Sequence, residues 1–574
     1  MKMQSSLKTF FSNLRKKRII EILAAFIGGG WLLLEFVHWL LVDHYHFPEK
    51  MIDITFITVL GTLLCTLIWR WFSGQEKSRK FKLELVLIPL VILVAVLLDI
   101  SLLLHLKGPE SEAIPTTKWK NSIAVLPFVD MSPQKDQDWF CDGITDEIIG
   151  RLSNISELKV PARTSVFFFK GKEQDIREIG KKLGVATVLE GSIQKVETKL
   201  RARVDLINIA DGFHLWSETY DRDLNDVFII QDDIAQKIVD VLKIRLFGKE
   251  QAQLVKHHTE DREVYNLYLK GRYFCNKRGK NDLLKAIAYF QEAVRQDPSY
   301  ALGYSGLGMA YVALGANQHL PSSEAFPRAK EAVLKALEIS QELDDAHVTL
   351  AGELFYFERD YSGSEREFKR AFELNPSNAE GHRFYAWLLM CTGRSEEAIK
   401  EMLLARDLDP LAPRNNADAG WIFYYARDYS RAVEELKRSI EIFPEHEGNY
   451  FRISRVYLQL GKYKEAIESI IHFSEQPYFM PTLAYAYALS GENDKGREML
   501  NNILRNLDRQ FFSPLEIAEV FVAMGDKKQA FIWLEKAFAE GDYAVNWLKI
   551  LPEFDPLHSD PRFLGILRRM NFPK

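Results

Sequence analysis

The stretch AIKEMLLARDLDPLAPRNNADAGWIFYYARDYSRAVEELKRSIEIFP, Ala398–Pro444, decides the fold. Alanine, large apolar residues and proline recur in it at fixed offsets, and Pro376, Pro410 and Pro444 are spaced 34 residues apart. A period of 34 residues is typical of a solenoid built from pairs of helices. Because one pair cannot bury its own apolar face, several pairs must stack, and the sequence predicts an all-α superhelix with a long concave surface.

The same pattern can be fitted about eight times between residues 262 and 545. Small or apolar residues recur in both helices of each copy, and a proline ends the second helix where it is present. We therefore assign residues 262–545 to a tetratricopeptide repeat (TPR) solenoid and residues 546–574 to a C-terminal cap.

Solenoids of this kind bind extended peptides or helices along a groove lined by the first helix of each pair. In this register the groove positions hold Phe355, Arg383, Trp387, Met390, Trp421, Tyr424, Phe451 and Arg455. Aromatic residues and arginine are enriched at binding hot spots. We predict that these residues form a protein-binding groove, and the arginines favour an acidic or carboxylate-bearing ligand. The alternative is that Trp387 and Trp421 pack against the next repeat as core.

Three long apolar runs lie in the first 106 residues, at Ile19–Val42, Ile52–Phe72 and Leu85–Leu106. Each is close to the roughly 20 residues that a helix needs to cross a hydrocarbon core of about 30 Å. The sequence therefore predicts a module of three transmembrane α-helices over residues 1–106, followed by a linker over residues 107–120.

Lysine and arginine are concentrated before the first run and between the second and third, which places both segments in the cytoplasm by the positive-inside rule. The predicted localisation is a bacterial inner (cell) membrane, with the N-terminus cytoplasmic and the soluble C-terminal region periplasmic. Glu35, His38 and Asp99 lie inside the predicted spans, where they are either functional or paired between helices. His44 and His46 could ligate a metal, but a short interfacial loop explains them more simply, and we predict no metal site.

The region between the linker and the repeats has the pattern of a small sheet with helices on it. Strands are expected at 122–129, 158–162, 186–196 and 200–209 and through Trp216, and helices from Asp142 or Thr145 as caps, at 176–183 and at 227–246. This order of elements predicts a small α/β domain over residues 121–250, without a glycine-rich phosphate loop.

Four segments of this domain resemble the TolB amino-terminal-like domain family, which is found beside TPR repeats. They are SIAVLPF at Ser122–Phe128, DGITDEI at Asp142–Ile148, LGVATVLEGSI at Leu183–Ile193, and GFHLWSETYDRDLNDVFIIQDDIA at Gly212–Ala235. The resemblance implies a sensor or docking module without chemistry of its own. Some members carry a winged-helix domain, a kinase or a cyclase in front, for which residues 1–118 leave no room.

Composition and motifs argue against other classes of function. A net charge of -5 gives no basic stripe, so we expect no nucleic acid as a partner. Cys65, Cys141, Cys275 and Cys391 are scattered and predict neither disulfides nor a zinc site. Asp142, Asp146 and Glu147 could be paired carboxylates for acid–base work, but acids at the start of a helix are explained by its dipole. Because no other catalytic motif occurs, we predict no enzymatic activity and no cofactor.

These features together predict a membrane-anchored scaffold or sensor that binds partner polypeptides through the TPR groove and the TolB-like domain. The alternative is a regulatory subunit of a signalling enzyme, a cyclase or a kinase, that is encoded on a separate chain.

Overall fold

The structure is a computed structural model, and it divides into two compact units, residues 1–114 and 115–574. The described residues are 56, 59–60, 62–67, 119, 121–197, 199–223, 227–244, 246, 259, 261–317, 319–510, 512–540 and 543–572. Almost all of the described residues therefore belong to the second unit.

Among the described residues, no helix is both long enough and apolar enough to cross a membrane. The predicted spans Ile19–Val42 and Leu85–Leu106 lie outside the described residues, as do Glu35, His38, His44, His46 and Asp99. Of the span Ile52–Phe72, the longest described helical stretch is residues 62–67, whereas a span needs about 20 residues. This finding corrects the predicted fold class and localisation: three transmembrane helices and a multi-pass membrane protein are not supported.

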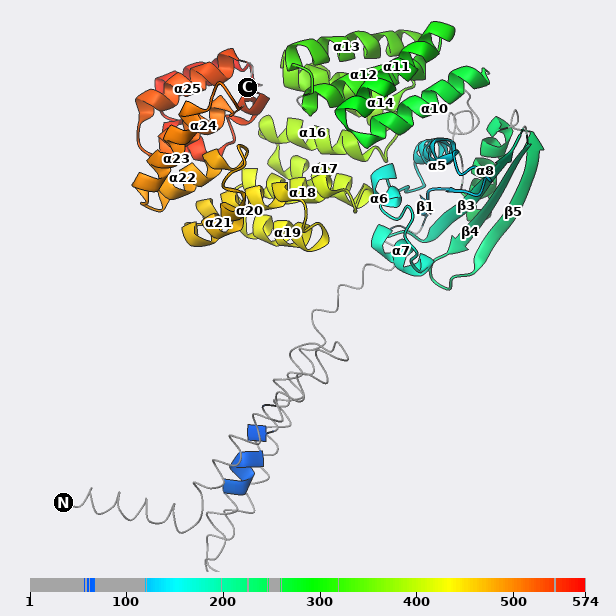
Figure 1. Cartoon of the computed structure of the whole chain (residues 1–574), viewed down its shortest axis with the longest axis horizontal. Coiled ribbons are helices and arrows are strands. Elements are labelled where there is room, and N and C mark those ends of the chain that lie inside the picture. Colours follow the sequence, from blue (N-terminus) through cyan, green and yellow to red (C-terminus); the bar gives the residue numbers. More distant parts are fainter. Residues whose placement is uncertain are drawn as a thin grey trace, which may run out of the picture. The chain divides into compact units, whose positions relative to one another are not determined.

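Residues 121–242 contain a small sheet with helices packed on it (Figure 1). The strands are β1 (Ile123–Val125), β2 (Val129–Asp130), β3 (Thr187–Val196), β4 (Lys199–Asn208) and β5 (His214–Asp223), and the helices are α5 (Asp138–Ser153), α6 (Arg163–Phe167), α7 (Ile176–Leu183) and α8 (Val227–Leu242). β3 is central, because β1 and β2 pair with it in parallel and β4 pairs with it antiparallel. β5 then pairs with β4, which gives the order β1-β3-β4-β5.

One face of this sheet is covered, and the other is open along the first half of β4 but buried at Asp205 and Ile207. Every second residue of β4 from Leu200 to Leu206 is buried, whereas Arg201 and Arg203 are exposed. This alternation is typical of an antiparallel strand with one face on a core. Helices α5 and α8 pack against each other and against the strands, and they supply the cover (Figure 1).

Two details of this module differ from the sequence prediction. The strand expected at 158–162 is a single bridge between Ser122 and Lys159, because the chain then turns and the Ala162 amide donates to the carbonyl of Leu408 in the repeat array at 2.9 Å. Helix α5 begins at Asp138, so Asp142 and Thr145 lie inside the helix instead of capping it.

The remainder of the chain is helical. Eight helix pairs follow one another over the described part of residues 262–539: α10 (Arg262–Lys277) with α11 (Lys280–Gln296), α12 (Ala301–Ala316) with α13 (Ser322–Ile339), α14 (Asp344–Glu353) and its extension η3 (Leu354–Glu358) with α15 (Tyr361–Leu374), α16 (Ala379–Cys391) with α17 (Ser395–Leu408), α18 (Pro413–Tyr425) with α19 (Tyr429–Ile442), α20 (Glu447–Gln459) with α21 (Tyr463–Ile470) and the short turn η4 (Ile471–Phe473), α22 (Met480–Leu489) with α23 (Asn493–Arg505), and α24 (Pro514–Ala523) with α25 (Lys527–Ala539). After them come η5 (Tyr543–Trp547), η6 (Pro552–Leu557) and α26 (Pro561–Arg569).

The turn inside the helix pairs repeats its backbone conformation. Residues with positive φ stand at Arg359, Gly393, Arg427 and Gly461, each 34 positions after the last, and again at Gly491 and Gly525. A left-handed residue at this point ends a helix by satisfying its last carbonyls. The period of 34 residues is therefore a period of the backbone, and the predicted TPR fold is confirmed.

Neighbouring helices approach closely where one of them has no side chain. The ring of Phe290 in α11 is fully buried between Gly271 of α10 and Gly306 of α12. A Cβ atom built at Gly271 would lie 2.5 Å from this ring, and one at Gly306 would lie 2.6 Å from it. These glycines let the second helix of the first pair pack against the first helices of two pairs.

We expect Gly306→Ala to lower the free energy of unfolding by about 1–3 kcal/mol, because the added methyl group overpacks a ring that cannot move. The matched control is Gly352→Ala, since a Cβ at Gly352 of α14 meets no atom within 4 Å. The control should be neutral or stabilising by up to about 1 kcal/mol, because alanine favours a helix more than glycine does. Urea unfolding of both variants measures the difference. Equal effects at the two positions would show that the Phe290 contact is not tight.

Candidate protein-interaction site

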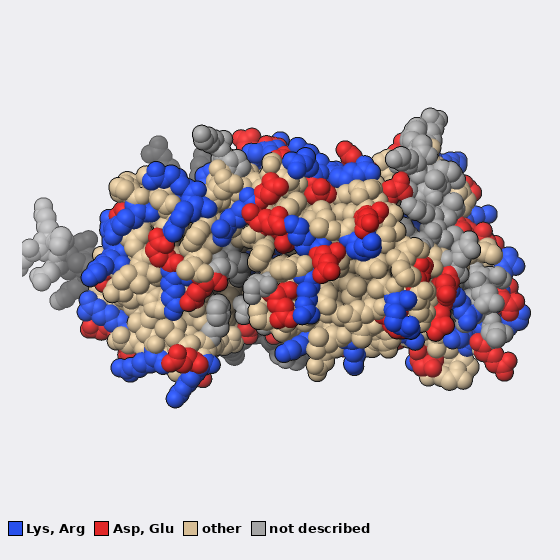
Figure 2. All heavy atoms as spheres, turned by 90° about the horizontal axis from the view of Figure 1, so that it is seen from above, with Lys and Arg blue, Asp and Glu red and all other residues tan. Residues whose placement is uncertain are grey.

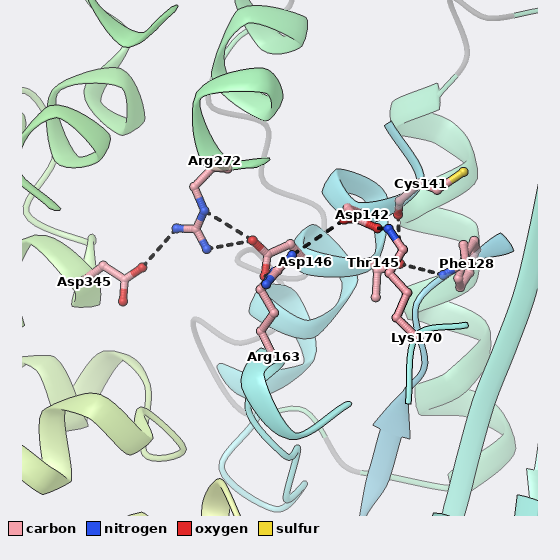
Figure 3. A network of polar contacts seen from close by, with 9 residues as sticks. All are labelled: Phe128, Cys141, Asp142, Thr145, Asp146, Arg163, Lys170, Arg272 and Asp345. Carbon is pink, nitrogen blue, oxygen red and sulfur yellow. Dashed lines mark hydrogen bonds and ion pairs between the residues drawn. The ribbon is translucent and has the colours of Figure 1, made fainter. Parts of the chain in front are cut away.

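The sheet and its helices, residues 121–242, are called the sheet module, and the helix pairs of residues 262–539 are called the repeat array. A network of charged side chains joins the sheet module to the repeat array (Figure 3). Asp142 and Asp146 lie one turn apart on α5. Asp146 forms ion pairs with Arg272 of α10 at 2.8 Å and with Arg163 of α6 at 3.6 Å, and Asp142 forms one with Lys170 at 2.6 Å. We call these five residues the junction network.

The junction network reaches further on both sides. Arg272 also contacts Asp345 of α14, two repeats along the array, at 3.5 Å. On the other side, Thr145 donates to the Cys141 carbonyl at 2.8 Å and accepts from the Phe128 amide at 3.0 Å, which fixes α5 to the segment after β1 (Figure 3). Arg272 therefore links the sheet module to two separate repeats.

A second tie is made by α6. The Ser165 hydroxyl donates to the Asp409 carboxylate at 2.5 Å and accepts from the Leu411 amide at 2.8 Å. Both Ser165 and Asp409 are buried. Burial raises the pKa of Asp409 to about 6, although the Ser165 hydrogen bond acts in the opposite direction. A short helix that the sequence pattern did not predict thus fixes the module to the end of α17.

The acids of α5 have a structural explanation. Burial raises the pKa of Asp142, and Lys170 and Arg163 act against this rise. Burial likewise raises the pKa of Glu147, against the effects of Arg151 and Arg272. Each aspartate is already engaged by basic side chains, which is the arrangement of a joint between two modules. Among the residues that the structure describes, no group of three or more His, Cys, Asp or Glu side chains could hold a metal ion.

The eight residues predicted to line the groove all lie on the first element of a pair: Phe355 on η3, Arg383, Trp387 and Met390 on α16, Trp421 and Tyr424 on α18, and Phe451 and Arg455 on α20. We call their common surface the groove face. The structure buries seven of these side chains and leaves only Trp421 partly exposed. In this structure, then, the groove face is not an open surface, and the alternative of core packing describes Trp387.

The groove face is covered by the chain's own C-terminal segment, η5 and η6. The ring of Trp547 packs against those of Phe355, Trp387 and Tyr425, with centroids 6.0, 5.1 and 6.2 Å away. Asn546, beside it, donates to the Tyr356 carbonyl at 3.2 Å. The sequence pattern assigned this segment to a cap but gave no sign that it lies on the groove face.

The predicted residues meet in two groups. Trp421 stacks on Tyr424 with centroids 4.2 Å apart and contacts Phe451 at 6.2 Å. Arg383 and Trp387 both donate to Asp418, at 3.1 and 3.4 Å. Met390 of α16 is fully buried in the hydrophobic core of the array.

Arg455 lies at the centre of a buried charge cluster that sequence reasoning missed. Its guanidinium contacts Glu519 of α24 at 2.7 Å and Glu553 of η6 at 2.8 Å, and Tyr424 donates to Glu553. All three charged side chains are at most 3% exposed. Burial raises the pKa of Glu519, Arg455 lowers it, and Glu553 adds to the rise. One arginine thus serves two buried carboxylates.

Comparisons with known proteins match parts of the chain. Residues 119–240 match the family model of the HilA/YgeH-like transcriptional regulator, second domain, and residues 349–413 and 417–470 match that of the tetratricopeptide repeat. The chain is thus similar to a regulatory domain over the stretch that we predicted to be TolB-like. The TolB assignment itself stays a prediction.

Curated relatives are similar over less than half of their own length. A putative adenylate cyclase 3 of Rhizobium meliloti is 33% identical over 43% of this chain and 43% of its own. The transcriptional regulator HilA of Salmonella typhimurium is 26% identical over 29% of this chain and 30% of its own. A solved structure of pilF from Pseudomonas aeruginosa is 20% identical, covers 38% of this chain and 97% of its own, and has a TM-score of 0.30, which carries no argument about function.

Removing one partner of the junction network should loosen the sheet module. Arg272→Met leaves Asp146 with Arg163 alone, and Asp146→Asn leaves Arg272 without its nearest carboxylate. Each should cost roughly 2–4 kcal/mol, since both side chains are mostly buried. The double variant should cost less than the sum, by about 0.5–3 kcal/mol. Native-state hydrogen exchange of the α5 amides measures these costs.

The control for this cycle is Arg295→Met, because Arg295 forms an exposed pair with Glu292 on one helix and should have little effect. Strict additivity of the two junction variants would show that Arg272 and Asp146 do not act together.

The charge cluster at Arg455 predicts a dependence of stability on pH. The pKa of Glu519 is raised in the folded chain. The contribution of Glu519 to the free energy of unfolding is therefore fully present below its unfolded pKa of about 4.3 and is lost as pH rises through its folded pKa. Glutamine does not titrate, so Glu519→Gln should remove this loss. Between pH 5 and pH 9 the free energy of unfolding should fall further in the native chain than in the variant, by at least about 1 kcal/mol. Urea unfolding at both pH values tests this. The exposed Glu535→Gln should follow the native chain, and a Glu519→Gln variant that also did so would contradict the assignment.

Proposed function

We propose that this chain is a protein-interaction scaffold with a regulatory role, in which a TPR array binds a partner polypeptide and carries the sheet module as a fixed docking part. The observation that supports this most is the joining of the two modules by buried polar contacts. Arg272 with Asp146, and Ser165 with Asp409, connect elements that are more than 100 residues apart in the chain. A module held in this way presents its surface in a constant relation to the repeats.

The comparisons favour a regulatory role for the sheet module. The family model matched by residues 119–240 belongs to transcriptional regulators, and the TPR model matches the centre of the array. The resemblance to the TolB amino-terminal-like family favours docking in place of catalysis, so we propose that the chain has no enzymatic activity of its own. A partner polypeptide, and not a small substrate, is then the ligand to look for.

A partner that uses the groove face has to take the place of the C-terminal segment. This segment shows which chemistry the groove face accepts: the indole of Trp547 among aromatic rings and the carboxylate of Glu553 on Arg455. One oxygen of Glu553 and the carbonyl oxygen of the Asn546 side chain are buried without a hydrogen-bond partner. Unsatisfied polar atoms weaken the hold of the segment, because their desolvation is not repaid.

Photocrosslinking in the full chain tests this function. A benzophenone amino acid at position 421 should capture a discrete partner polypeptide from an extract of the source cells, because Trp421 is the groove-face residue that is partly exposed. Adding Trp547→Ala should raise the yield by about threefold or more, because the competing segment is weakened. The control position is Ile532 of α25, which is 51% exposed and lies outside the groove face.

The pattern of capture decides the outcome. Capture at position 421 that is specific and rises with Trp547→Ala supports the scaffold. Capture that is the same at positions 421 and 532, or none with Trp547→Ala, contradicts it. Thermal unfolding followed by circular dichroism confirms that each variant is folded.

A second function is favoured by one observation, the 33% identity to part of a putative adenylate cyclase. On this proposal the chain is the regulatory subunit of a signalling enzyme that is encoded separately. Cyclic AMP formation by a separately expressed cyclase catalytic domain, measured with and without the full chain, distinguishes this function from the first.

A further inference from the structure

A group of lysines and aromatic rings lies where the sheet module meets the first repeat. It consists of Trp139 at the start of α5, Lys270, Tyr273, Phe274 and Lys277 on α10, and Lys285 and Tyr289 on α11. We call these seven residues the lysine–aromatic patch. On α10 they occupy the face opposite the buried residues Tyr265, Tyr268 and Leu269. The patch is therefore separate from the groove face and from the junction network.

Three rings of the patch, Tyr273, Phe274 and Tyr289, form a continuous platform. Phe274 and Tyr289 are stacked, with centroids 5.6 Å apart and planes at 9°, and Tyr273 contacts Phe274 edge-on at 5.4 Å. All of these rings are partly exposed. Leu284 of α11, which precedes Lys285 in the sequence, is a further apolar side chain that is 49% exposed.

Each lysine of the patch lies over a ring. The Lys270 ammonium is 4.9 Å from the ring of Trp139 and 5.9 Å from that of Tyr289. Lys277 lies 4.4 Å from Tyr273, and Lys285 lies 5.2 Å from Phe274. A cation over a ring face is held in place by the ring quadrupole, and it keeps its hydrogen-bond donors free.

These ammonium groups form no ion pair within the described part of the chain. Other lysines of the array do, for example Lys335 with Glu338 and Lys495 with Glu492, each on a single helix. The patch therefore carries three positive charges that are oriented by aromatic rings but not neutralised. Arg278, between α10 and α11, and Lys280, the first residue of α11, are also exposed and add to the charge at this end.

We propose that the lysine–aromatic patch is a docking surface for an acidic segment of a partner polypeptide. Carboxylates of the segment meet Lys270, Lys277 and Lys285, and its apolar side chains lie against the exposed ring edges and Leu284. This inference goes beyond the proposed scaffold function, because it names a surface and a ligand chemistry that do not involve the groove face.

The spacing of the lysines defines the segment. Lys270 and Lys277 are seven residues apart on one face of α10, which is about 10.5 Å along a helix. An extended chain covers this distance in about three residues. In the polyproline II form of an extended chain, which has three residues per turn, every third side chain lies on the same side. The surface thus fits an extended segment of this form with a carboxylate at every third position.

Two other anionic partners fit less well. Single-stranded nucleic acid binds by stacking bases on free ring faces, whereas here ammonium groups and neighbouring rings cover those faces. The net charge of the chain is -5, and Figure 2 shows a face on which positive and negative side chains are interspersed, so no extended basic surface on that face would follow a phosphate backbone. A lipid surface requires apolar side chains that protrude, and the rings of the patch are only partly exposed.

Binding of a defined probe to the full chain tests the proposal. The probe is a fluorescein-labelled peptide of about twelve residues with glutamate at every third position and a single phenylalanine, and fluorescence anisotropy measures its dissociation constant. We expect binding that weakens with added salt. Lys277→Glu combined with Lys285→Glu should weaken it by at least about tenfold, because attraction becomes repulsion.

Matched variants separate the patch from general charge. Lys437→Glu with Lys528→Glu makes the same change in net charge at exposed lysines of α19 and α25, and should leave binding unchanged. Lys277→Arg with Lys285→Arg keeps the charges and should retain binding. Trp547→Ala should not affect it, which distinguishes this surface from the groove face.

Three results would overturn the proposal: no measurable binding of the peptide to the native chain, equal loss in the patch and control variants, or tighter binding of oligo(dT) or of phosphatidylserine vesicles that the patch variants abolish. The last result would reassign the surface to nucleic acid or to lipid.

Discussion

Close contact between a large side chain and a residue without one is the constraint on which the array depends. Phe290 fills the space left by Gly271 and Gly306, so that one ring joins three helices. A helix pair has too little apolar surface to be stable alone. Contacts of this kind bury part of that surface against the next pair. The left-handed turn that recurs at Gly393 and Gly461 keeps both helices of each pair in register with them. Every surface of the array is built on this repeated geometry.

The repeats could be predicted from the sequence because their signal is local and periodic. The same holds for β3 and β4, whose bounds lie close to those of the strands expected at 186–196 and 200–209. Contacts between distant segments leave no such signal. Nothing in the sequence around Glu553 indicates that this side chain contacts Arg455, 98 residues earlier. Likewise, nothing around Trp547 indicates that the indole lies among the rings of the groove face. The groove residues were therefore placed on the right helices, but their cover was missed.

The cover changes what the groove face means physically. An open groove presents aromatic side chains to water until a ligand arrives. Here Trp547 and Glu553 already remove that surface from water, so a ligand gains only the difference between its own contacts and those of the segment. Arg455 enters this difference through both of its contacts, because it pairs with Glu519 as well as with Glu553 in a buried place. Once Glu519 loses its proton, the cluster holds one positive charge and two carboxylates, which is less stable than a matched pair and weakens the hold on the segment.

Helix α10 connects the three features of the molecule. Gly271 faces the array, the neighbouring Arg272 faces the sheet module and α14, and Lys270 points over Trp139 on the outside. Consecutive residues on a helix point in different directions, so three adjacent positions can serve three neighbours. The outer face of α10 therefore belongs to a helix whose other two faces are fixed by packing and by buried charge. The sheet module and the first repeat are therefore held together by contacts on two sides of a single helix.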